Sequence, residues 1–511
     1  MPHSLLDDTC FTIRTDGEQG SVALPEILHL LTTDNIVSFD ALQTHQQQPW
    51  YAFLVQLAAM GIARETEGTW PASADAWRAV LLGLADGQAS AWQLVTENPA
   101  EPAFLQSPVP EGSIDEAGFK ADIPTPDQLD VLITSKNHDV KSARVLHPQA
   151  EHWIYALCTL QTMEGFLGRG NYGVVRMNGG FGNRPLVGLA PDLTWGARFR
   201  RDVQVLLEER EELSTRYDLS GHALLWLSPW DGQKSSAIPL ENCDPYFIEV
   251  CRRIRLTATD GDITCWRTNT KGQRVDAPKD LNGITGDPWT PIEKKGAKAL
   301  TLGESGFTYD LLQELILGSE YTRPPALEIR EGDGDALYLV ARTLVRGQGK
   351  TDGLHKRIVP IPKKTSAIFR TRSERELLAK RAQARVELVD LVRRKVLYSA
   401  IAALVSSGRD ERPDSDKISP YLQRFTRAID ARFFDALWAS VEMDEEEARK
   451  QWQHVLKEEA EQTFEEAKRS TPIAAIHRWK ARSKAQSFFE SRIRTVLDAL
   501  YEPTTTESEA V

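Results

Sequence analysis

Apolar residues change their spacing repeatedly along the first two thirds of the chain, which predicts a mixture of helices and strands. Residues 50–62 carry apolar side chains at helical spacing, and their density predicts a buried helix. Two shorter runs, residues 336–344 and 357–362, are typical of strands. Three glycines lie between these runs, at positions 347, 349 and 353, and they predict a tight turn. We therefore expect a strand–turn–strand element in this part of the chain.

The last third has a different pattern. From Ser373 to Tyr501 there is no strand-like alternation and little Gly or Pro, so we expect four amphipathic helices packed as a bundle. Ser373 and Glu376 are spaced as a capping box that opens the first helix. The second helix is expected to bury Phe425, Ile429, Phe433 and Leu437 along one face. The fourth is expected to bury Ile473, Ile476, Trp479, Phe488, Ile493, Val496, Leu497 and Leu500.

These patterns predict an α+β fold: a mixed α/β domain over residues 1–370, a four-helix bundle over residues 371–501, and a disordered acidic tail over residues 502–511. With 41% hydrophobic and 26% charged residues, the composition is that of a soluble globular protein. No apolar run is long enough to span a membrane, and the N-terminus does not resemble a signal peptide. Five widely spaced cysteines argue against a disulfide framework and a four-cysteine zinc site. We expect a cytoplasmic protein.

The segment around the expected turn reverses the sign of the chain's charge. The whole chain has a net charge of −12, but residues 341–372 contain nine Lys or Arg and a single acid, Asp352. A glycine-rich tip inside a basic belt is suited to contact with a polyanion. An ordinary solvated hairpin is the alternative. Gly349-Lys350-Thr351 also resembles the end of a phosphate-binding P-loop, although Leu344 occupies the position of its first glycine.

A second polar segment follows an expected strand at residues 129–134. Within residues 135–144, five side chains are Lys, Asn, His or Arg, which can donate to phosphates or base edges. A plain surface loop is the alternative. His138, Asp139 and His147 could also form a metal site or an acid–base pair, but no further ligand at a suitable spacing accompanies them.

A third segment is rich in glycine. Seven glycines lie between positions 165 and 182, with a strand expected at residues 173–177. Glycine backbone beside arginine can lie against a sugar-phosphate chain or enter a narrow groove. A set of tight turns is the alternative.

In this order, the three segments resemble the large subunit of the type I-E CRISPR surveillance complex, Cascade (the CasA family). The resemblance rests on Ser135-Lys136-Asn137-His138-Asp139-Val140-Lys141, on Arg176-Met177-Asn178-Gly179-Gly180-Phe181-Gly182-Asn183-Arg184-Pro185 and on Val345-Arg346-Gly347-Gln348-Gly349-Lys350-Thr351. The minor stretches at residues 227–230 and 286–291 and the helical C-terminal region agree with it.

Together the three segments combine glycine backbone with Lys, Arg or Asn donors and lack a nucleophile–base arrangement, so we expect a DNA-binding protein that is not an enzyme and uses no cofactor or metal. The resemblance implies a division of labour. An RNA guide held by other Cascade subunits pairs with the target, while this subunit recognises a short flanking motif, the PAM, on double-stranded DNA. The family uses a loop, a glycine loop and a lysine finger for the PAM, a β-hairpin wedge to open the duplex, and the bundle to face the displaced strand and recruit a helicase-nuclease.

Carried onto this chain, the resemblance implies four groups of DNA-binding residues. The PAM loop contains Lys136, Asn137, His138 and Lys141. The glycine loop contains Arg176, Asn178, Gly179, Gly180, Asn183 and Arg184. Lys279 is the candidate lysine finger. The wedge contains Arg346, Gly347, Gln348, Gly349, Lys350 and Thr351.

One feature of the sequence departs from the family pattern, and one alternative function stays open. Some family members carry a cysteine cluster before the lysine finger, and Cys243, Cys251 and Cys265 do not have its spacing. The alternative function is an enzyme: a nucleotide hydrolase using Gly349-Lys350-Thr351, or a metal-dependent nuclease using His138, Asp139 and His147.

Overall fold

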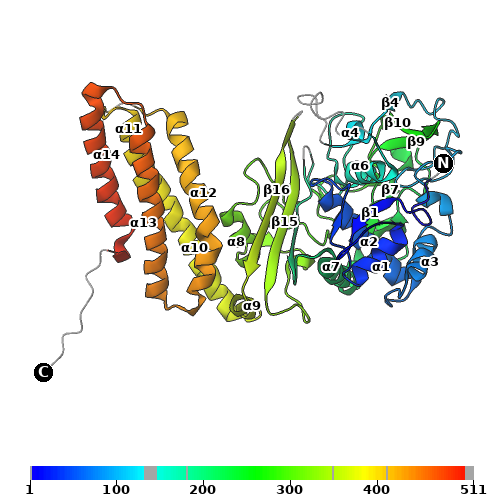
Figure 1. Ribbon diagram of the computed structural model, residues 1–511, viewed down its shortest axis with the longest axis horizontal. Coiled ribbons are helices and arrows are strands. Elements are labelled where there is room, and N and C mark those ends of the chain that lie inside the picture. The colour runs from blue at the N-terminus through cyan, green and yellow to red at the C-terminus, as the bar shows by residue number, and fades with distance from the viewer. Residues whose placement is uncertain are drawn as a thin grey trace. The chain divides into compact units, whose positions relative to one another are not determined.

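The computed structural model describes residues 3–131, 145, 147–179, 182–347, 350–409 and 412–500 (Figure 1). The chain forms two compact units. The first consists of Met1–Phe307 and Glu320–Pro360, and the second of Thr308–Ser319 and Ile361–Val511. One helix, α8 (Tyr309–Leu317), therefore belongs to the second unit although the first unit continues after it.

The first unit combines helices with several small sheets. Its α-helices are α1 (Leu24–Thr32), α2 (Gln47–Glu65), α3 (Ala74–Leu84), α4 (Pro126–Leu129), α6 (Ala150–Met163) and α7 (Trp195–Glu209). Its strands up to β8 are β1 (Phe11–Arg14), β2 (Gln19–Val22), β3 (Ser38–Phe39), β4 (Ala121–Ile123), β5 (Leu186–Ala190), β6 (His222–Leu224), β7 (Ile238–Pro239) and β8 (Cys243–Ile248). The later strands are β9 (Arg253–Thr259), β10 (Asp262–Thr268), β11 (Val275–Asp276), β12 (Ile292–Glu293), β13 (Lys298–Ala299), β14 (Tyr321–Thr322), β15 (Leu337–Gly347) and β16 (Lys350–Ile361).

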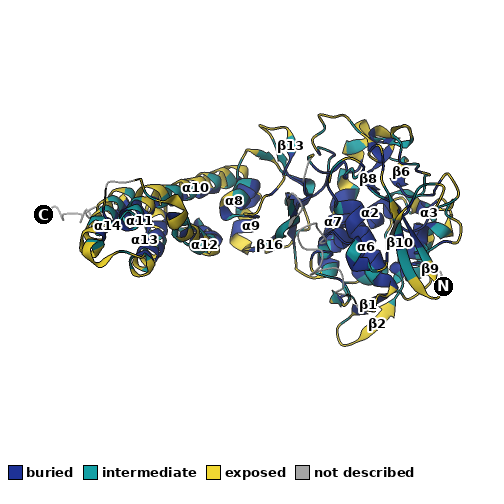
Figure 2. Ribbon diagram, turned by 90° about the horizontal axis from the view of Figure 1, so that it is seen from above, coloured by how far each residue is buried: buried dark blue, intermediate teal, exposed yellow. Residues whose placement is uncertain are grey.

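Helix α2 is the centre of the first unit. Every residue from Gln48 to Ile62 is buried, as the apolar density predicted, and α3, α6, α7 and β8 pack against the helix (Figure 2). Trp50 stacks on Phe11 and Phe53 and meets Tyr155 edge-on. A helix that is apolar all round is stable only where protein covers it on all sides.

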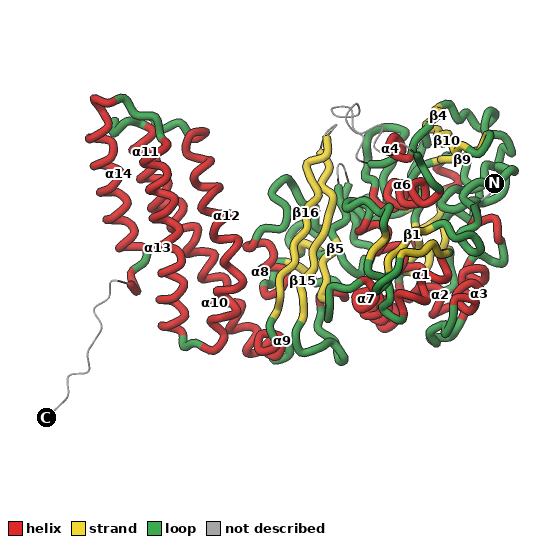
Figure 3. Tube along the Cα trace, in the orientation of Figure 1, coloured by secondary structure: helices red, strands yellow, loops and turns green. Residues whose placement is uncertain are grey.

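The expected hairpin is present and longer than predicted. Its strands extend to Gly347 on one side and begin again at Lys350 on the other, in a sheet with the order β16-β15-β5 (Figure 3). Strand β15 pairs antiparallel with β5, with Tyr338 opposite Ala190 and Arg342 opposite Leu186. The two residues between the strands, Gln348 and Gly349, lie outside the described residues.

The strand predicted at residues 173–177 is wrong, because residues 175–176 form a turn and the rest of this range is irregular. Of the strand predicted at residues 129–134, residue 129 ends helix α4, and residues 132–134 lie outside the described residues. The N–H of Val174 donates to the carbonyl of Glu164, and the N–H of Val175 donates to the carboxylate of Glu249 at 2.9 Å. These partners replace the ladder of a neighbouring strand, so β-branched residues are buried here without forming a sheet.

The second unit is helical. It contains α8, α9 (Lys363–Phe369), α10 (Arg372–Leu391), a π-helical turn (Val392–Leu397), α11 (Tyr398–Val405), α12 (Ser415–Ala439), α13 (Glu445–Ser470) and α14 (Ala475–Val496). Phe425, Ile429, Phe433 and Leu437 are all fully buried, as predicted for one face of α12. The expected capping box is not formed. Helix α10 begins at Arg372, and Glu376 pairs with that residue at 3.0 Å.

The predicted core face of α14 is partly wrong. Ile476 and Trp479 are each 84% exposed, and Phe488 is only half-buried. The buried face instead contains Ala481, Ala485, Phe489 and Ile493, four residues apart along the helix. Small residues set this face because Ala481 lies against Gly408, where an added Cβ would be 3.1 Å from the Ala481 backbone.

Candidate nucleic-acid interface

Strand β15 connects the hairpin to the glycine-rich segment. The hydroxyl of Thr343 lies 3.4 Å from Oδ1 of Asn183, and both side chains are buried. The Asn183 amide also donates to the carbonyl of Leu302 at 2.8 Å, and its oxygen accepts the N–H of the same residue at 3.1 Å. Asn183 therefore holds the end of the predicted glycine loop against β15. This residue is 3% exposed, although the resemblance assigns it to the DNA-binding residues of the glycine loop.

Arg346 makes a second connection, at the end of β15 near the predicted tip. Its guanidinium donates to the carbonyl of Val131 and to Oε2 of Glu164 at 3.2 Å. Val131 is the last described residue before the predicted PAM loop, and Glu164 follows α6 at the start of the glycine-rich segment. The side chain of Arg346 is only 9% exposed. Arg346, which the resemblance assigns to the wedge, therefore has its partners inside the protein.

The candidate lysine finger lies in a turn next to the glycine loop. Lys279 is exposed, and two residues later the N–H of Leu281 donates to the carbonyl of Pro278. In the next turn, which the N–H of Ile284 closes on the carbonyl of Leu281, Gly283 has a φ of +78°, and an added Cβ would lie 2.7 Å from the backbone nitrogen of Asn178. Only glycine allows this approach. The turn that directly follows the one with Lys279 is therefore a neighbour of the start of the glycine loop.

Arg176 and Arg184, which the resemblance assigns to the DNA-binding glycine loop, are both buried. Nε of Arg184 lies 2.6 Å from Oδ2 of Asp287, and its pKa is lowered by burial. Arg176 stacks on Phe247 at 4.3 Å and donates to backbone carbonyls on β8. Burial by itself raises the pKa of Asp287, but the two guanidinium groups outweigh it and the net pKa is lowered. These side chains support the loop from within the protein.

Glu249 and Glu164 are two buried acids that the sequence did not single out. Burial raises the pKa of Glu249 to about 7, against the opposing effects of the Val175 N–H and neighbouring arginines. Burial also raises the pKa of Glu164, against the opposing charges of Arg346 and Arg252. Neither acid lies in a motif, and only their tertiary partners mark them.

The remaining predicted site residues are distributed as follows. Lys136, Asn137, His138, Lys141, Gly180, Gln348 and Gly349 lie outside the described residues. Gly179 is exposed, whereas Asn178 and Thr351 are half-buried. Gly347 and Lys350 belong to the hairpin strands as backbone, and their side chains are not described.

The position of Lys350 and Thr351 does not support the nucleotide-hydrolase alternative. A P-loop needs its lysine and threonine at the start of a helix, but Lys350 and Thr351 begin strand β16. Among the residues that the structure describes, no three His, Cys, Asp or Glu side chains are grouped to hold a metal ion. His138 and Asp139 lie outside that part of the chain, and His147 lies inside it.

The fold is that of known CRISPR-associated proteins. CasA from Thermus thermophilus is 16% identical, with a TM-score of 0.64 over 97% of this chain and 100% of that chain. Cse1 from Thermobifida fusca is 14% identical, with a TM-score of 0.65 over 98% of each chain. Cse1 from Acidimicrobium ferrooxidans is 16% identical, with a TM-score of 0.63 over 98% of this chain and 99% of that chain. The α+β prediction with a helical C-terminal region is confirmed.

The sequence itself establishes the family. The model of the family described as CRISPR-associated protein Cse1 matches residues 5–463, so this chain belongs to the Cse1 family, the large subunit of type I-E Cascade. The predicted resemblance is thereby confirmed. No curated protein matches the chain. Across the described residues, every helix is too short or too polar to cross a bilayer.

Proposed function

We propose that this chain is the non-catalytic subunit that recognises the PAM on target DNA and begins strand separation for a guide RNA held by other Cascade subunits. The observation that carries this proposal is the convergence at β15. Thr343 holds the glycine loop through Asn183, and Arg346 holds Val131, the last described residue before the predicted PAM loop. The turn that follows Lys279 packs on the same glycine loop through Gly283.

This convergence supports a joint action on one duplex. The three PAM elements and the wedge come from segments more than 200 residues apart in sequence, between positions 136 and 351. PAM elements joined to a hairpin by direct hydrogen bonds can place its tip at the first base-pair step beside the motif. Opening that step costs a few kcal/mol of unstacking, which an inserted side chain offsets with its own contacts.

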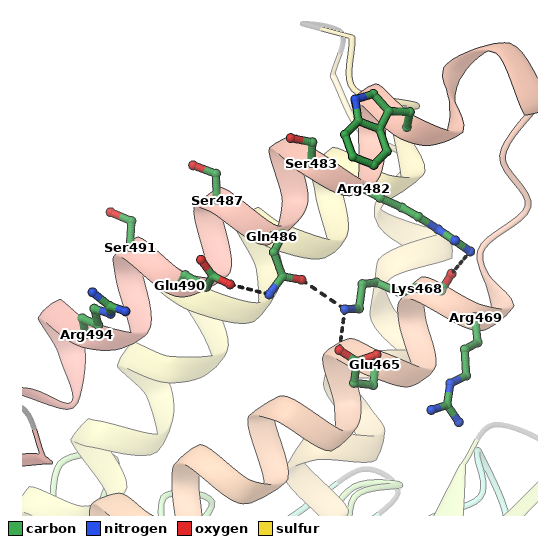
Figure 4. Close-up of a pocket in the computed structure, with 11 residues that line it drawn as sticks. Glu465, Lys468, Arg469, Arg482, Ser483, Gln486, Ser487, Glu490, Ser491 and Arg494 are labelled. Atoms are coloured by element: carbon green, nitrogen blue, oxygen red, sulfur yellow. Dashed lines mark hydrogen bonds and ion pairs between the residues drawn. The ribbon is translucent and has the colours of Figure 1, made fainter.

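The helical unit offers a surface for the later steps. A groove of about 840 Å³ lies between the end of α13 and α14, lined by Lys468, Arg469, Trp479, Arg482 and Arg494 among others (Figure 4). Helix α14 carries six Lys or Arg and one acid, Glu490. Cations beside an exposed aromatic ring suit a single strand, because phosphates pair with the cations and bases stack on the ring. This supports a role in holding the displaced strand and recruiting the helicase-nuclease.

The wedge is tested by removing its tip in the assembled, guide-loaded complex. Gln348→Ala with Lys350→Ala is expected to leave PAM duplex binding largely intact and to slow strand separation. A target with an unpaired bubble beside the PAM should restore opening, because the cost of unstacking has already been met. Fluorescence of a base analogue at the first target positions measures the opening.

The matched control is Gln233→Ala with Lys234→Ala, which removes the same two side-chain types from a short helical turn elsewhere in the first unit. It should behave as the unaltered protein on both targets. Equal loss on paired and bubbled targets would mean that Gln348 and Lys350 supply only charge. No loss on either target would mean that the hairpin has no part in opening.

A further inference from the structure

Arg346 binds two chain segments at once from the end of the hairpin. Its Nη1 donates to the carbonyl of Val131 and to the carboxylate of Glu164. The Glu164 side chain is only 3% exposed. Both contacts are thus shielded from water. Inside a protein, hydrogen bonds to charged groups are stronger and more restrictive than at the surface.

The other end of the segment that begins after Val131 has a separate anchor. The N–H of Val145 donates to Oδ2 of Asp127 at 2.6 Å, and Asp127 is buried in α4. Nearby, Asp130 accepts from His45 and Gln46, each at 2.8 Å. Residues 127–130 are therefore held by the body of the first unit. The contact at Val131 joins this segment to Arg346 of the hairpin, whereas the contact at Val145 joins it to Asp127 of α4.

The Glu164 side of the contact is braced as well. Arg252 donates to the carbonyl of Gly165 at 3.2 Å and to that of Tyr172, which closes the start of the glycine-rich segment. The carbonyl of Glu164 itself accepts the N–H of Val174 at 3.1 Å. Glu164 is therefore a firm point against which the Arg346 guanidinium is oriented.

We propose that Arg346 is a positioning residue that couples the segment following Val131 to the tip of the β15–β16 hairpin. The inference rests on the proposed function, because it assigns PAM contact to that segment and duplex opening to the tip. Arg346 itself touches no DNA. It makes the position of the hairpin tip depend on the position of Val131, so that PAM contact at one element favours opening at the other.

Arg346→Lys tests the coupling without leaving Glu164 beside a neutral residue. Lysine keeps the charge, but its compact ammonium on a flexible four-carbon stem cannot reproduce the planar, forked geometry of the guanidinium. In the guide-loaded complex we expect opening of a fully paired target with the correct PAM to slow on the order of tenfold, within the usual range of coupling between sites. PAM duplex binding and opening of a bubbled target should stay unchanged.

Two further variants separate coupling from a merely structural role. Glu164→Gln keeps the Arg346–Val131 bond and removes the charge pair, so it should slow paired-target opening less than Arg346→Lys. Arg342→Lys is the matched control, because Arg342 lies four residues earlier on the same strand and contacts Gln47 instead. It should open both targets normally. A structural role would make the opening rates follow the melting temperatures of the variants.

The outcomes distinguish this inference from the proposed function. If the unaltered complex shows no PAM-dependent opening, or if the Gln348/Lys350 double variant is normal, the proposed function fails. If those controls behave as expected but Arg346→Lys opens the paired target normally, or loses paired and bubbled targets equally, the coupling inference alone is overturned. Should Arg346→Lys not assemble, Glu164→Gln decides: a normal rate on the paired target overturns the coupling, and a selective loss supports it.

Discussion

Among single residues, Glu249 is placed where its charge is costly. It is buried beneath the glycine-rich segment, where its carboxylate accepts the N–H of Val175 at 2.9 Å. Burial raises the pKa of the carboxyl group to about 7, although Arg176 and Arg184 act in the opposite direction. An unfolded glutamate has a pKa near 4.3. The folded protein therefore keeps a proton at pH 6 that the unfolded chain releases.

The sign of the pH effect follows from this difference. Because the folded pKa is raised, the stability contributed by Glu249 is fully present below about pH 4 and is lost as the pH rises through about 7. Glu249→Gln cannot ionise and still offers an oxygen to Val175. Between pH 5 and 8 we expect the variant to gain roughly 2.5 kcal/mol in free energy of unfolding relative to the unaltered protein. Denaturant unfolding of both proteins across this range measures it. A constant difference would show that Glu249 is ionised in the folded state at both limits.

At the level of elements, α14 has one face in the core and an apolar pair outside it. Phe489 is 4% exposed and stacks on Phe464 with 4.5 Å between ring centres, whereas Ile476 and Trp479 are exposed near the start of the helix. Large exposed apolar side chains beside a basic groove are typical of a binding surface. The element therefore combines a structural face with a face available to a partner.

This division predicts that two substitutions on α14 differ in their effect on the free energy of unfolding and on strand binding. Trp479→Ala should change the free energy of unfolding by less than about 0.5 kcal/mol, because the ring is exposed. Phe489→Ala should lower it by about 3–5 kcal/mol, because it empties a packed site. In the complex, Trp479→Ala should weaken protection of the displaced strand and slow its cleavage while R-loop formation stays normal. Footprinting and a cleavage assay measure these effects.

Leu377→Ala is the control for Trp479→Ala, since Leu377 is 57% exposed on α10 and does not line the α13–α14 groove. It should leave strand protection and cleavage unchanged. Normal protection and cleavage with Trp479→Ala would remove the groove from the proposed function.

At the scale of the whole molecule, the charge distribution limits what the chain does alone. The net charge is −12, while the basic residues are gathered in local segments such as residues 341–372. An acidic chain repels DNA at long range, and short basic segments attract it only at close range. Tight binding is therefore expected only inside the assembly, where base pairing with the guide adds to the contacts of this subunit.

The isolated chain should accordingly bind duplex DNA weakly, with a Kd no tighter than about 10⁻⁶ M at physiological salt and a steep loss as salt increases. Fluorescence anisotropy with labelled duplexes, with and without the guide-loaded subunits, measures this. Tight, salt-insensitive binding by the isolated chain would contradict the division of labour proposed for the complex.

Local patterns in the sequence were sufficient for the α+β class, the buried helix α2, the strand–turn–strand element and the core face of α12. Each depends on short-range spacing of apolar residues, which a single segment contains in full. The glycine-rich and basic segments were also visible in order, and that order carried the resemblance to the family that the match over residues 5–463 confirms.

Burial and partnership depended on contacts between distant segments. In the sequence, Arg176, Arg184 and Arg346 are recognisable only as basic residues. Arg184 pairs with Asp287, 103 positions away, and Arg346 pairs with Glu164, 182 positions away. These partners hold the two side chains inside the protein. The exposure of Ile476 and Trp479 arose because Ala481 and Gly408 allow the other face of α14 to approach closely. Helix α8 joined the second unit through contacts with α10 and α12. Periodicity shows that a face is apolar or charged, whereas the fold selects which face is covered and which charge finds a partner.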